Sequence, residues 1–405
     1  MKRILLLVLV FGSMIGVKAQ YKNDNVLYKT IDVVELCKTL AENPGYLLLD
    51  VRSKGENEDT SFSVSLNIGR LKGAKNVMVQ ELGQRIHELD EYRDKPVFVY
   101  CSHSQRSRRA SKMLADSGFT KVFNINGGMT ALHTSQEDCI EQLMENQKAY
   151  SVLPAAEICD LLRKKKDEVF LLDVRSDSAW NRVSRFEKEN GIGYLKGTTH
   201  IPRREIATNL SQIPRDKHII ITDIGGAEPA FAAILLTKLG YSKVSVMLEG
   251  MDRFLSTDET ELPCRSDMYE SASPYSVMNA MEYGRFVKVA KNFLVLDIRT
   301  ADEFANKHKD EFRNIGHLSQ AINVPFTELS QKITELSVHK NKPVIVYGFS
   351  AGHEAFASAR QLSDAGFKNV TVLIGGIFSI RWTAANRKDH AYLAALVEDV
   401  PEINK

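Results

Sequence analysis

The sequence predicts an α/β protein of three tandem domains, each built from a parallel β-sheet flanked by helices on both faces. Two observations support this fold class. One sequence pattern occurs three times along the chain, and within each copy short apolar runs alternate with amphipathic helical segments. The length of 405 residues agrees with two or three domains of about 150 residues each.

The repeated pattern has three markers that keep the same order in every copy. The first is an apolar run followed by Asp-Val-Arg or Asp-Ile-Arg, the second is a short apolar run, and the third is a turn containing glycine. The first two markers lie at 47–53 and 97–100, at 171–176 and 219–222, and at 295–300 and 344–347. The third runs from a glycine followed by an aromatic residue to the glycine turn, over 118–129, 240–251 and 366–377. A period of about 123 residues is too long for a solenoid repeat, so each copy should have its own core.

The first helix of each domain is expected at its N-terminal end. Apolar residues spaced at i, i+3, i+4 and i+7 define one helix face in each of the first two copies. These residues are Val33, Leu36, Cys37 and Leu40, and then Ala155, Ile158, Cys159 and Leu162. Pro154 suits the first turn of the second of these helices.

Strands and a further helix follow in each copy. The apolar runs before Asp50 and after Lys95 are unbroken, as expected for strands that are buried on both faces. Residues 105–116 are predicted to form a helix, and residues 122–125 the next strand. Alternating strands and helices indicate a parallel sheet, whose ligands bind beyond the carboxyl ends of its strands. We therefore expect the chemistry to follow Tyr100 directly.

These patterns place the domain boundaries. We expect a signal peptide over residues 1–19, followed by one domain with an active loop and two degenerate domains, over 27–135, 150–258 and 274–386. The polar segments 133–148 and 256–273 lack clear periodicity over most of their length and are expected to be short tethers between packed domains.

The N-terminus has the layout of a secretory signal peptide. Lys2 and Arg3 precede an apolar run over residues 4–17, and small or compact residues precede a cut after Ala19. The run is too short to span a bilayer, and no cysteine at the cut would carry a lipid. We expect a secreted or periplasmic protein with no membrane span in the mature chain.

The charge balance and the cysteine content argue against two classes of protein, nucleic-acid-binding proteins and disulfide scaffolds. The 53 basic and 51 acidic residues leave no basic excess for a nucleic acid. Five cysteines are too few for a disulfide scaffold. Cys37 and Cys159 fit small buried hydrophobic residues, because both lie on the apolar face of the first helix. Cys139 and Cys264 lie in corresponding tethers, where export would permit a disulfide whose pairing the sequence does not define.

The residues after Tyr100 form the candidate active site. A strand runs into a loop and then into a helix, so successive backbone N–H groups can form an anion cradle at the positive end of the helix dipole. Cys101 lies at the mouth of this loop, where the helix dipole and Arg106 favour the thiolate. A thiolate held in this way can attack a sulfane sulfur and keep it as a persulfide. We assign Cys101 as catalytic and the next six residues as substrate-binding: Ser102, His103, Ser104, Gln105, Arg106 and Ser107.

This pattern resembles the rhodanese, or sulfurtransferase, family. The matching segments of the first copy are Leu49 to Arg52, Gly73 to Val77, Cys101 to Ser107, and Asn126 to Met129. The resemblance covers nearly all of the mature chain as three tandem rhodanese-like domains. It implies that Cys101 carries a persulfide and that the amides of residues 102–106 form the cradle. Ser102 and Ser104 depart from the family, many of whose members have a basic residue and Gly there.

The second and third copies lack the residues that this chemistry needs. The residues that replace Cys101 and Arg106 are Asp223 and Glu228 in the second copy and Gly348 and His353 in the third. An acid cannot accept a sulfane sulfur, and glycine offers no nucleophile. We therefore expect both copies to be structural or to shape the substrate site.

Three aspartates recur even where the cysteine is absent. Asp50, Asp173 and Asp297 each end the first marker run, so we expect them to satisfy loop amides. Arg52 could also contact an anion. His103 is expected to face solvent or substrate rather than to act as a base.

The leading functional hypothesis is an exported sulfurtransferase that moves sulfane sulfur from a donor such as thiosulfate to cyanide or a thiol. Related phosphatases have one more residue between Cys and Arg than the stretch from Cys101 to Arg106, which favours sulfur over a phosphoryl group. Two alternatives stay open: a non-catalytic rhodanese-like scaffold that holds a protein partner, and a thiol redox protein with a resolving cysteine. No metal-ligand spacing or nucleotide fingerprint occurs, so no cofactor is expected.

Overall fold

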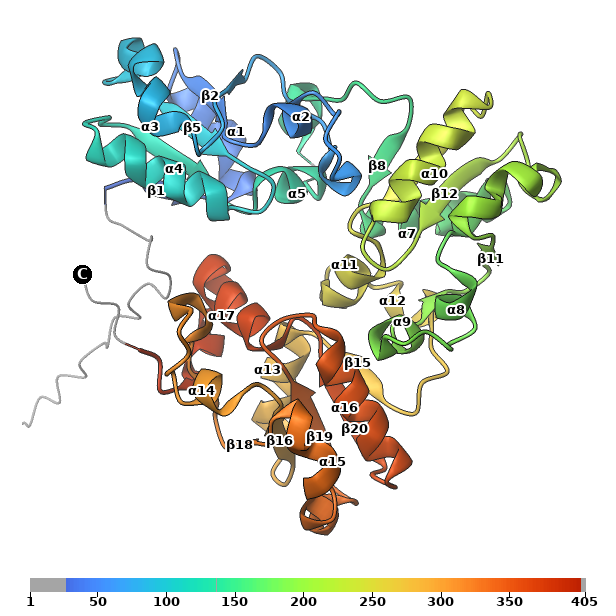
Figure 1. Cartoon of the computed structure of the whole chain (residues 1–405). Coiled ribbons are helices and arrows are strands. Elements are labelled where there is room, and N and C mark those ends of the chain that lie inside the picture. The colour runs from blue at the N-terminus through green and yellow to red at the C-terminus, as the bar shows by residue number, and fades with distance from the viewer. Residues whose placement is uncertain (1–26, 136, 402–405) are drawn as a thin grey trace, which may run out of the picture.

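The computed structural model describes residues 27–135 and 137–401 and folds them into three domains of one architecture (Figure 1). The predicted signal peptide lies outside these residues. Each domain has a five-stranded sheet in which every strand pair is parallel, and the strand order is equivalent in all three. The predicted fold class is confirmed.

The strand order can be followed domain by domain. In domain 1 it is β1 (Lys29–Ile31), β6 (Val122–Ile125), β5 (Val97–Tyr100), β2 (Leu47–Asp50) and β4 (Lys75–Asn76). In domain 2 it is β8 (Ser151–Leu153), β13 (Val244–Met247), β12 (His218–Thr222), β9 (Val169–Asp173) and β11 (Thr199–His200). In domain 3 it is β15 (Ser276–Met278), β20 (Asn369–Leu373), β19 (Pro343–Tyr347), β16 (Leu294–Asp297) and β18 (Ala321–Asn323).

Helices cover both faces of each sheet. In domain 1, α4 (Gln105–Asp116) packs on one face, while α1 (Val33–Glu42) and α5 (Gly128–His133) pack on the other. Adjacent strand residues point to opposite faces and so belong to different cores: Leu49 and Val99 with Leu114, and Leu48 and Phe98 with Leu36. The unbroken apolar runs of the sequence are therefore strands buried on both sides.

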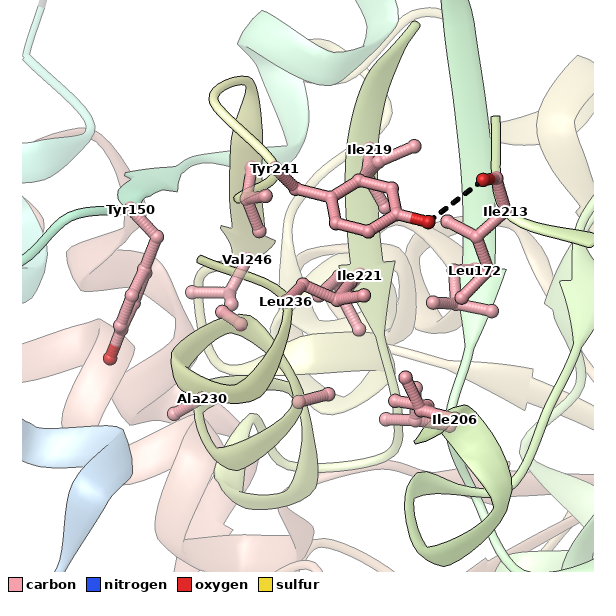
Figure 2. Close-up of a cluster of buried hydrophobic side chains, with 14 of the residues drawn as sticks. Tyr150, Leu172, Ile206, Ile213, Ile219, Ile221, Ala230, Leu236, Tyr241 and Val246 are labelled. Atoms are coloured by element: carbon pink, nitrogen blue, oxygen red, sulfur yellow. Dashed lines mark hydrogen bonds between the residues drawn. The ribbon is translucent and has the colours of Figure 1, made fainter. Parts of the chain in front are cut away.

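Domains 2 and 3 repeat this layering. Their corresponding helices are α10 (Ala227–Lys238), α7 (Ala155–Lys165) and α11 (Gly250–Ser256), and then α16 (His353–Asp364), α13 (Ala280–Val289) and α17 (Gly376–Asn386). Figure 2 shows the α10 face of domain 2, where Ile219 and Ile221 pack with Leu236, and the Tyr241 hydroxyl donates to the carbonyl of Ile213 at 3.0 Å. Shorter helices complete the domains: α2 (Lys54–Asn57), α3 (Leu82–Arg85), α8 (Asp177–Trp180), α9 (Glu187–Gly191), α14 (Ala301–Phe304) and α15 (Leu329–Lys332).

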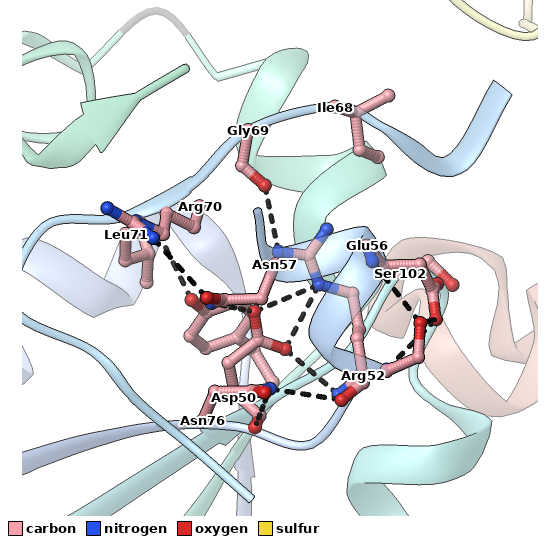
Figure 3. A network of polar contacts seen from close by, with 12 residues as sticks. Asp50, Arg52, Glu56, Asn57, Ile68, Gly69, Arg70, Leu71, Asn76 and Ser102 are labelled. Carbon is pink, nitrogen blue, oxygen red and sulfur yellow. Dashed lines mark hydrogen bonds and ion pairs between the residues drawn. The ribbon is translucent and has the colours of Figure 1, made fainter. Parts of the chain in front are cut away.

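The recurrent aspartate forms a buried ion pair in every domain. Figure 3 shows Asp50 accepting hydrogen bonds from the backbone and the guanidinium of Arg52, with the shortest side-chain contact at 2.7 Å. Arg52 also donates to the carbonyl of Gly69 at 2.8 Å, which ties the end of β2 to the segment before β3 (Arg70–Leu71). The corresponding pairs are Asp173 with Arg175 and Asp297 with Arg299. The expected structural role of these aspartates is confirmed.

The segments between the domains are more ordered than the sequence indicated. After domain 1, α6 (Asp138–Leu143) leads into β7 (Met144–Glu145), which pairs antiparallel with β3. After domain 2, α12 (Arg265–Met268) leads into β14 (Tyr269–Glu270), which pairs with β10 (Tyr194–Leu195). After domain 3, β21 (Val397–Glu398) pairs with β17 (His317–Leu318). The expectation of simple tethers was wrong, because each segment adds a short strand to the domain that precedes it.

Disulfides hold the first two of these segments in place. Cys37 of α1 is bonded to Cys139 of α6, and Cys159 of α7 to Cys264 at the start of α12, with Cα–Cα distances of 6.1 and 6.0 Å. Cys37 and Cys159 do lie on the apolar helix face, but their interpretation as small buried hydrophobic residues was wrong. All five cysteines of the chain are described, and Cys101 is the free one.

We expect the first disulfide to be a major stabilising element of domain 1. The Cys37→Ala/Cys139→Ala double variant should lose about 2–5 kcal/mol of unfolding free energy, because the bond closes a loop with a sequence separation of 102 residues. Chemical denaturation of the double variant, with Cys101→Ala as the control, checks this. An unchanged midpoint in the double variant would contradict it.

Candidate active site

The candidate catalytic loop connects β5 to α4 in domain 1. Cys101 follows the last residue of β5 and has only 1% of its surface exposed. Ser104, which precedes α4, has a left-handed backbone with φ of 81°. A residue with a Cβ pays about 1–2 kcal/mol for that conformation. The Ser104 hydroxyl compensates by accepting from the Gly127 amide at 2.5 Å and by donating to Asn126 at 3.3 Å.

The glycine turn of the third marker lets α5 approach this loop. The amides of Met129 and Thr130 donate to the carbonyls of Cys101 and Ser102 at 2.8 and 3.1 Å. A Cβ on Gly128 would lie 2.1 Å from the Cys101 carbonyl oxygen, so only glycine fits between them. The first two loop carbonyls are thereby fixed against α5.

Arg106 forms a bidentate ion pair that sequence reasoning did not find. Its two terminal nitrogens donate to the two oxygens of Glu56 at 2.6 and 2.7 Å, and one also donates to the Ser102 hydroxyl at 2.8 Å. The hydrogen bonds that Arg106 donates to Glu56 raise the pKa of Arg106, and its interactions with Cys101 add to that rise. Glu56 belongs to a capping box with Ser53 at the start of α2. That spacing was readable in the sequence, but it identifies a helix start and not a partner 50 residues away.

His103 connects the loop to domain 2. Its Nε2 lies 2.5 Å from Oε1 of Glu249, and its Nδ1 lies 2.9 Å from the hydroxyl of Ser102. The same carboxylate oxygen of Glu249 accepts from the Thr130 hydroxyl of α5 at 2.8 Å. Half of the His103 side chain is exposed, so it lies at the mouth of the loop.

The remaining predicted site residues are Gln105 and Ser107, and they differ in exposure. Gln105 is exposed, whereas Ser107 is fully buried and donates to Asn124 of β6 at 2.6 Å. The structure therefore joins the polar groups of Ser102, His103 and Arg106 beside Cys101, while the side chains of Ser104 and Ser107 bond to residues 126 and 124.

Domain 3 also reaches this region. Asn386, the last residue of α17, accepts from Arg108 of α4, and its carbonyl accepts from the Asn126 amide at 3.0 Å. Figure 1 shows the three domains around a common centre, with α5, α11 and α17 on their inner sides. The loop of domain 1 thus lies where all three domains meet.

The equivalent loop of domain 2 is filled by its own side chain. Asp223 occupies the position of Cys101, and its carboxylate accepts from the backbone amides of Gly226 and Glu228, the latter at 3.2 Å. Burial raises the pKa of Asp223 to about 7. Glu228 pairs with Arg203. The amides that could cradle an anion in this domain already bind a carboxylate of the chain.

The equivalent loop of domain 3 lacks the left-handed residue that precedes the helix in domain 1. Gly352, before α16, has a φ of −68°, and no residue from Gly348 to His353 has a left-handed backbone. Phe349 packs against Phe378, and the guanidinium of Arg313 lies 5.2 Å from its ring centre. Aromatic packing replaces the anion site.

Fold and loop together define a thiol site on a parallel α/β domain, with an unpaired cysteine at the start of a helix. Within residues 27–135 and 137–401, no group of acidic, histidine and cysteine side chains could hold a metal ion. No helix in that part of the chain is long and apolar enough to cross a membrane.

The chain belongs to the rhodanese-like domain family. The family model matches residues 33–135, 155–257 and 282–382. An uncharacterized protein of Bacillus subtilis, YqhL, is 37% identical over 99 residues, which are 23% of this chain and 70% of that protein. The tRNA uridine(34) hydroxylase of an Enterobacter species is 27% identical over 111 residues, 26% of this chain and 30% of that enzyme.

The chain also matches solved structures. A thiosulfate sulfurtransferase from Pseudomonas aeruginosa is 16% identical, with a TM-score of 0.23, and the match covers 85% of this chain and 66% of that one. The chain therefore spans less than two thirds of the hydroxylase and of the Pseudomonas sulfurtransferase.

We expect acid to weaken the contact between domains 1 and 2. Burial raises the pKa of Glu249, but the hydrogen bond and charge of His103 outweigh it and hold the pKa at about 2, below its usual 4.5. The stability that Glu249 provides is therefore present above about pH 4.5 and is lost as the pH falls toward about 2. Thermal melts should show a larger loss of Tm over this range in the wild type than in Glu249→Gln. Parallel curves would contradict this.

Proposed function

We propose that the protein is an exported sulfurtransferase with one working site, at Cys101. The observation that carries the proposal is that the loop of domain 1 combines an unpaired cysteine with an arginine beside it at the start of α4. The other two loops hold a carboxylate or aromatic packing instead. Membership of the rhodanese-like family supports this reading.

The proposed reaction has two steps. The Cys101 thiolate attacks the sulfane sulfur of the donor, the donor's bond to that sulfur breaks, and the leaving group departs with the electron pair. An acceptor thiolate or cyanide then attacks the outer sulfur of the Cys101 persulfide, and the Cys101 thiolate is released with the electron pair of the S–S bond. The loop amides and Arg106 stabilise the negative charge that the cysteine or persulfide sulfur carries in both steps.

The disulfides bear on two further parts of the proposal. Disulfides persist in oxidising compartments, so the two in this chain support export. They also occupy all four other cysteines, which leaves Cys101 without a free resolving partner in the same chain. This favours sulfur transfer over the thiol redox alternative.

A steady-state assay tests the proposal. The purified mature chain is incubated with a sulfane donor and cyanide, and thiocyanate is measured. We expect turnover that depends on both reactants and stops after alkylation of Cys101. Absence of thiocyanate with thiosulfate, an alkyl persulfide and polysulfide would favour the scaffold alternative, in which the degenerate domains hold a protein partner.

A further inference from the structure

The cations at the mouth of the domain 1 loop are already paired with carboxylates. Both oxygens of Glu56 bind Arg106, and the Glu56 side chain is only 5% exposed, so little water screens the pair. The neighbouring Arg108 is buried and donates to Asn386, away from the loop. Much of the positive charge of Arg106 is therefore compensated by Glu56 before a donor binds.

The second carboxylate comes from domain 2. Glu249 contacts His103 at 2.5 Å and lies within the reach of Arg253, whose charge also helps to lower its pKa. The charged groups around the mouth are then the carboxylates of Glu56 and Glu249 and the guanidinium groups of Arg106 and Arg253. Glu249 offsets positive charge at the point where a donor would enter.

The backbone conformation of Glu249 is unfavourable for a residue with a side chain, which indicates that the contacts of this side chain have a function. Glu249 directly precedes α11 and has a left-handed φ of 54°, while the corresponding residues before α5 and α17 are Gly127 and Gly375, with φ of 73° and 76°. A side chain in this conformation costs about 1–2 kcal/mol, a cost that the glycines avoid. Domain 2 alone has a glutamate at this position, and that glutamate contacts the loop of domain 1.

Two classes of sulfur donor differ in the negative charge that they would bring to these carboxylates. Thiosulfate is a dianion, and it would approach Cys101 past the carboxylates of Glu56 and Glu249. A persulfide of a thiol, R–S–SH, carries at most one negative charge, and that charge lies on the sulfur to be transferred. Like charges at short range disfavour binding, and the effect grows with the charge of the ligand.

We propose that the site takes its sulfur from a persulfide of a thiol in preference to thiosulfate, and that Glu249 of domain 2 sets this preference. The inference rests on the proposed function and narrows its donor. Cys101 thiolate attacks the outer sulfur of R–S–SH, the S–S bond breaks, and R–S⁻ leaves with the electron pair and takes up the proton that the persulfide carried. Cys101 is left as the persulfide anion.

The test compares loading of Cys101 by two donors in the full mature chain. Second-order rate constants for the gain of sulfur are measured with thiosulfate and with the persulfide of 2-mercaptoethanol, whose carbon group is uncharged. The two rate constants are compared as a ratio, persulfide to thiosulfate. The intrinsic reactivity of each donor is the same with every variant, so it cancels when the ratios of two variants are compared. In Glu249→Gln the amide oxygen can still accept from His103 and Thr130, so the geometry is kept while the charge is removed.

We expect Glu249→Gln to lower the persulfide-to-thiosulfate ratio by about 10-fold, mainly because thiosulfate reacts faster. Glu249→Gly, which installs the residue of the other two copies and removes the backbone cost, should give a change in the same direction. Glu261→Gln is the matched control, since Glu261 also loses a charge and pairs with Arg387 of domain 3 and not with a residue of the loop. Its ratio should equal that of the wild type.

The outcomes separate this inference from the proposed function. If neither donor loads Cys101, the proposed function fails. If both donors load it and the ratio is the same in the wild type, Glu249→Gln and Glu249→Gly, the proposed function stands and the donor preference set by Glu249 is overturned.

Discussion

Cys101→Ser is expected to abolish sulfur transfer, with a fall in kcat/KM to the background of the assay. The hydroxyl of serine keeps the shape of the loop but does not form a stable covalent adduct with sulfane sulfur. Cys101 is nearly fully buried against the core of domain 1, so the small volume change should leave the fold intact. The measurement is thiocyanate formation together with a thermal melt.

The other two copies supply the controls for this result. Gly348 has room for a methyl group, since an added Cβ would lie 3.4 Å from Ile298, so Gly348→Ala should keep the activity of the wild type. Asp223→Asn should keep the activity of domain 1 as well, although the amides that Asp223 binds lose a charged partner. Substantial activity in Cys101→Ser, or its loss in Gly348→Ala, would contradict the assignment of one working site.

Arg106→Glu is expected to lower sulfur transfer by at least about 10-fold. The substitution places a carboxylate where the guanidinium stood beside Cys101, so the loop loses positive charge that stabilises a sulfur anion. It also leaves Glu56 facing a like charge in a nearly buried position, which should cost about 3 kcal/mol of stability. Transfer from an anionic donor should fall more than alkylation of Cys101 by iodoacetamide, because a neutral reagent is not repelled.

Arg109→Glu is the matched control for Arg106→Glu. Arg109 lies three residues further along α4 and is exposed, so the same change in net charge occurs on the same helix outside the loop. A fall of equal size in both variants would show that overall charge matters and not the pairing of Arg106 beside Cys101.

Much of the fold was accessible from the sequence because the strands are buried on both faces. Runs such as 47–49 and 97–100 are apolar without interruption, and this pattern recurs at a constant spacing. The strands in the segments after domains 1 and 2 were not predicted. These strands, β7 and β14, have two residues each and depend on pairing with β3 and β10. Such short strands leave no periodicity to detect.

The site could be predicted only in part. The order of strand, cysteine and helix identified the loop from local sequence, whereas the partners of its side chains come from distant positions. Glu56 lies 50 residues from Arg106, and Glu249 lies 146 residues from His103. One signal for Glu249 was visible: it stands where the other copies have Gly127 and Gly375. The pairing of Cys37 with Cys139 likewise needed the packing of α6 on α1.

The disulfides and the contacts of Glu249 give the degenerate domains a physical role. In domain 2 the carboxylate of Asp223 occupies the amides of its own loop, while Glu249 places a carboxylate on the loop of domain 1. Domain 3 contacts the same region through Asn386. Domains 2 and 3 lack the cysteine in their own loops, but both contribute contacts to the site in domain 1.

The intact mass of the mature chain after exposure to a sulfane donor tests the central claim most directly. The account predicts that the wild type gains the mass of one sulfur atom, that peptide mapping places the gain on Cys101, and that cyanide removes it. The two disulfides should stay unchanged, and Cys101→Ser should gain nothing. A wild-type mass that stays constant with both thiosulfate and an alkyl persulfide, or a gain that persists in Cys101→Ser, would contradict the account.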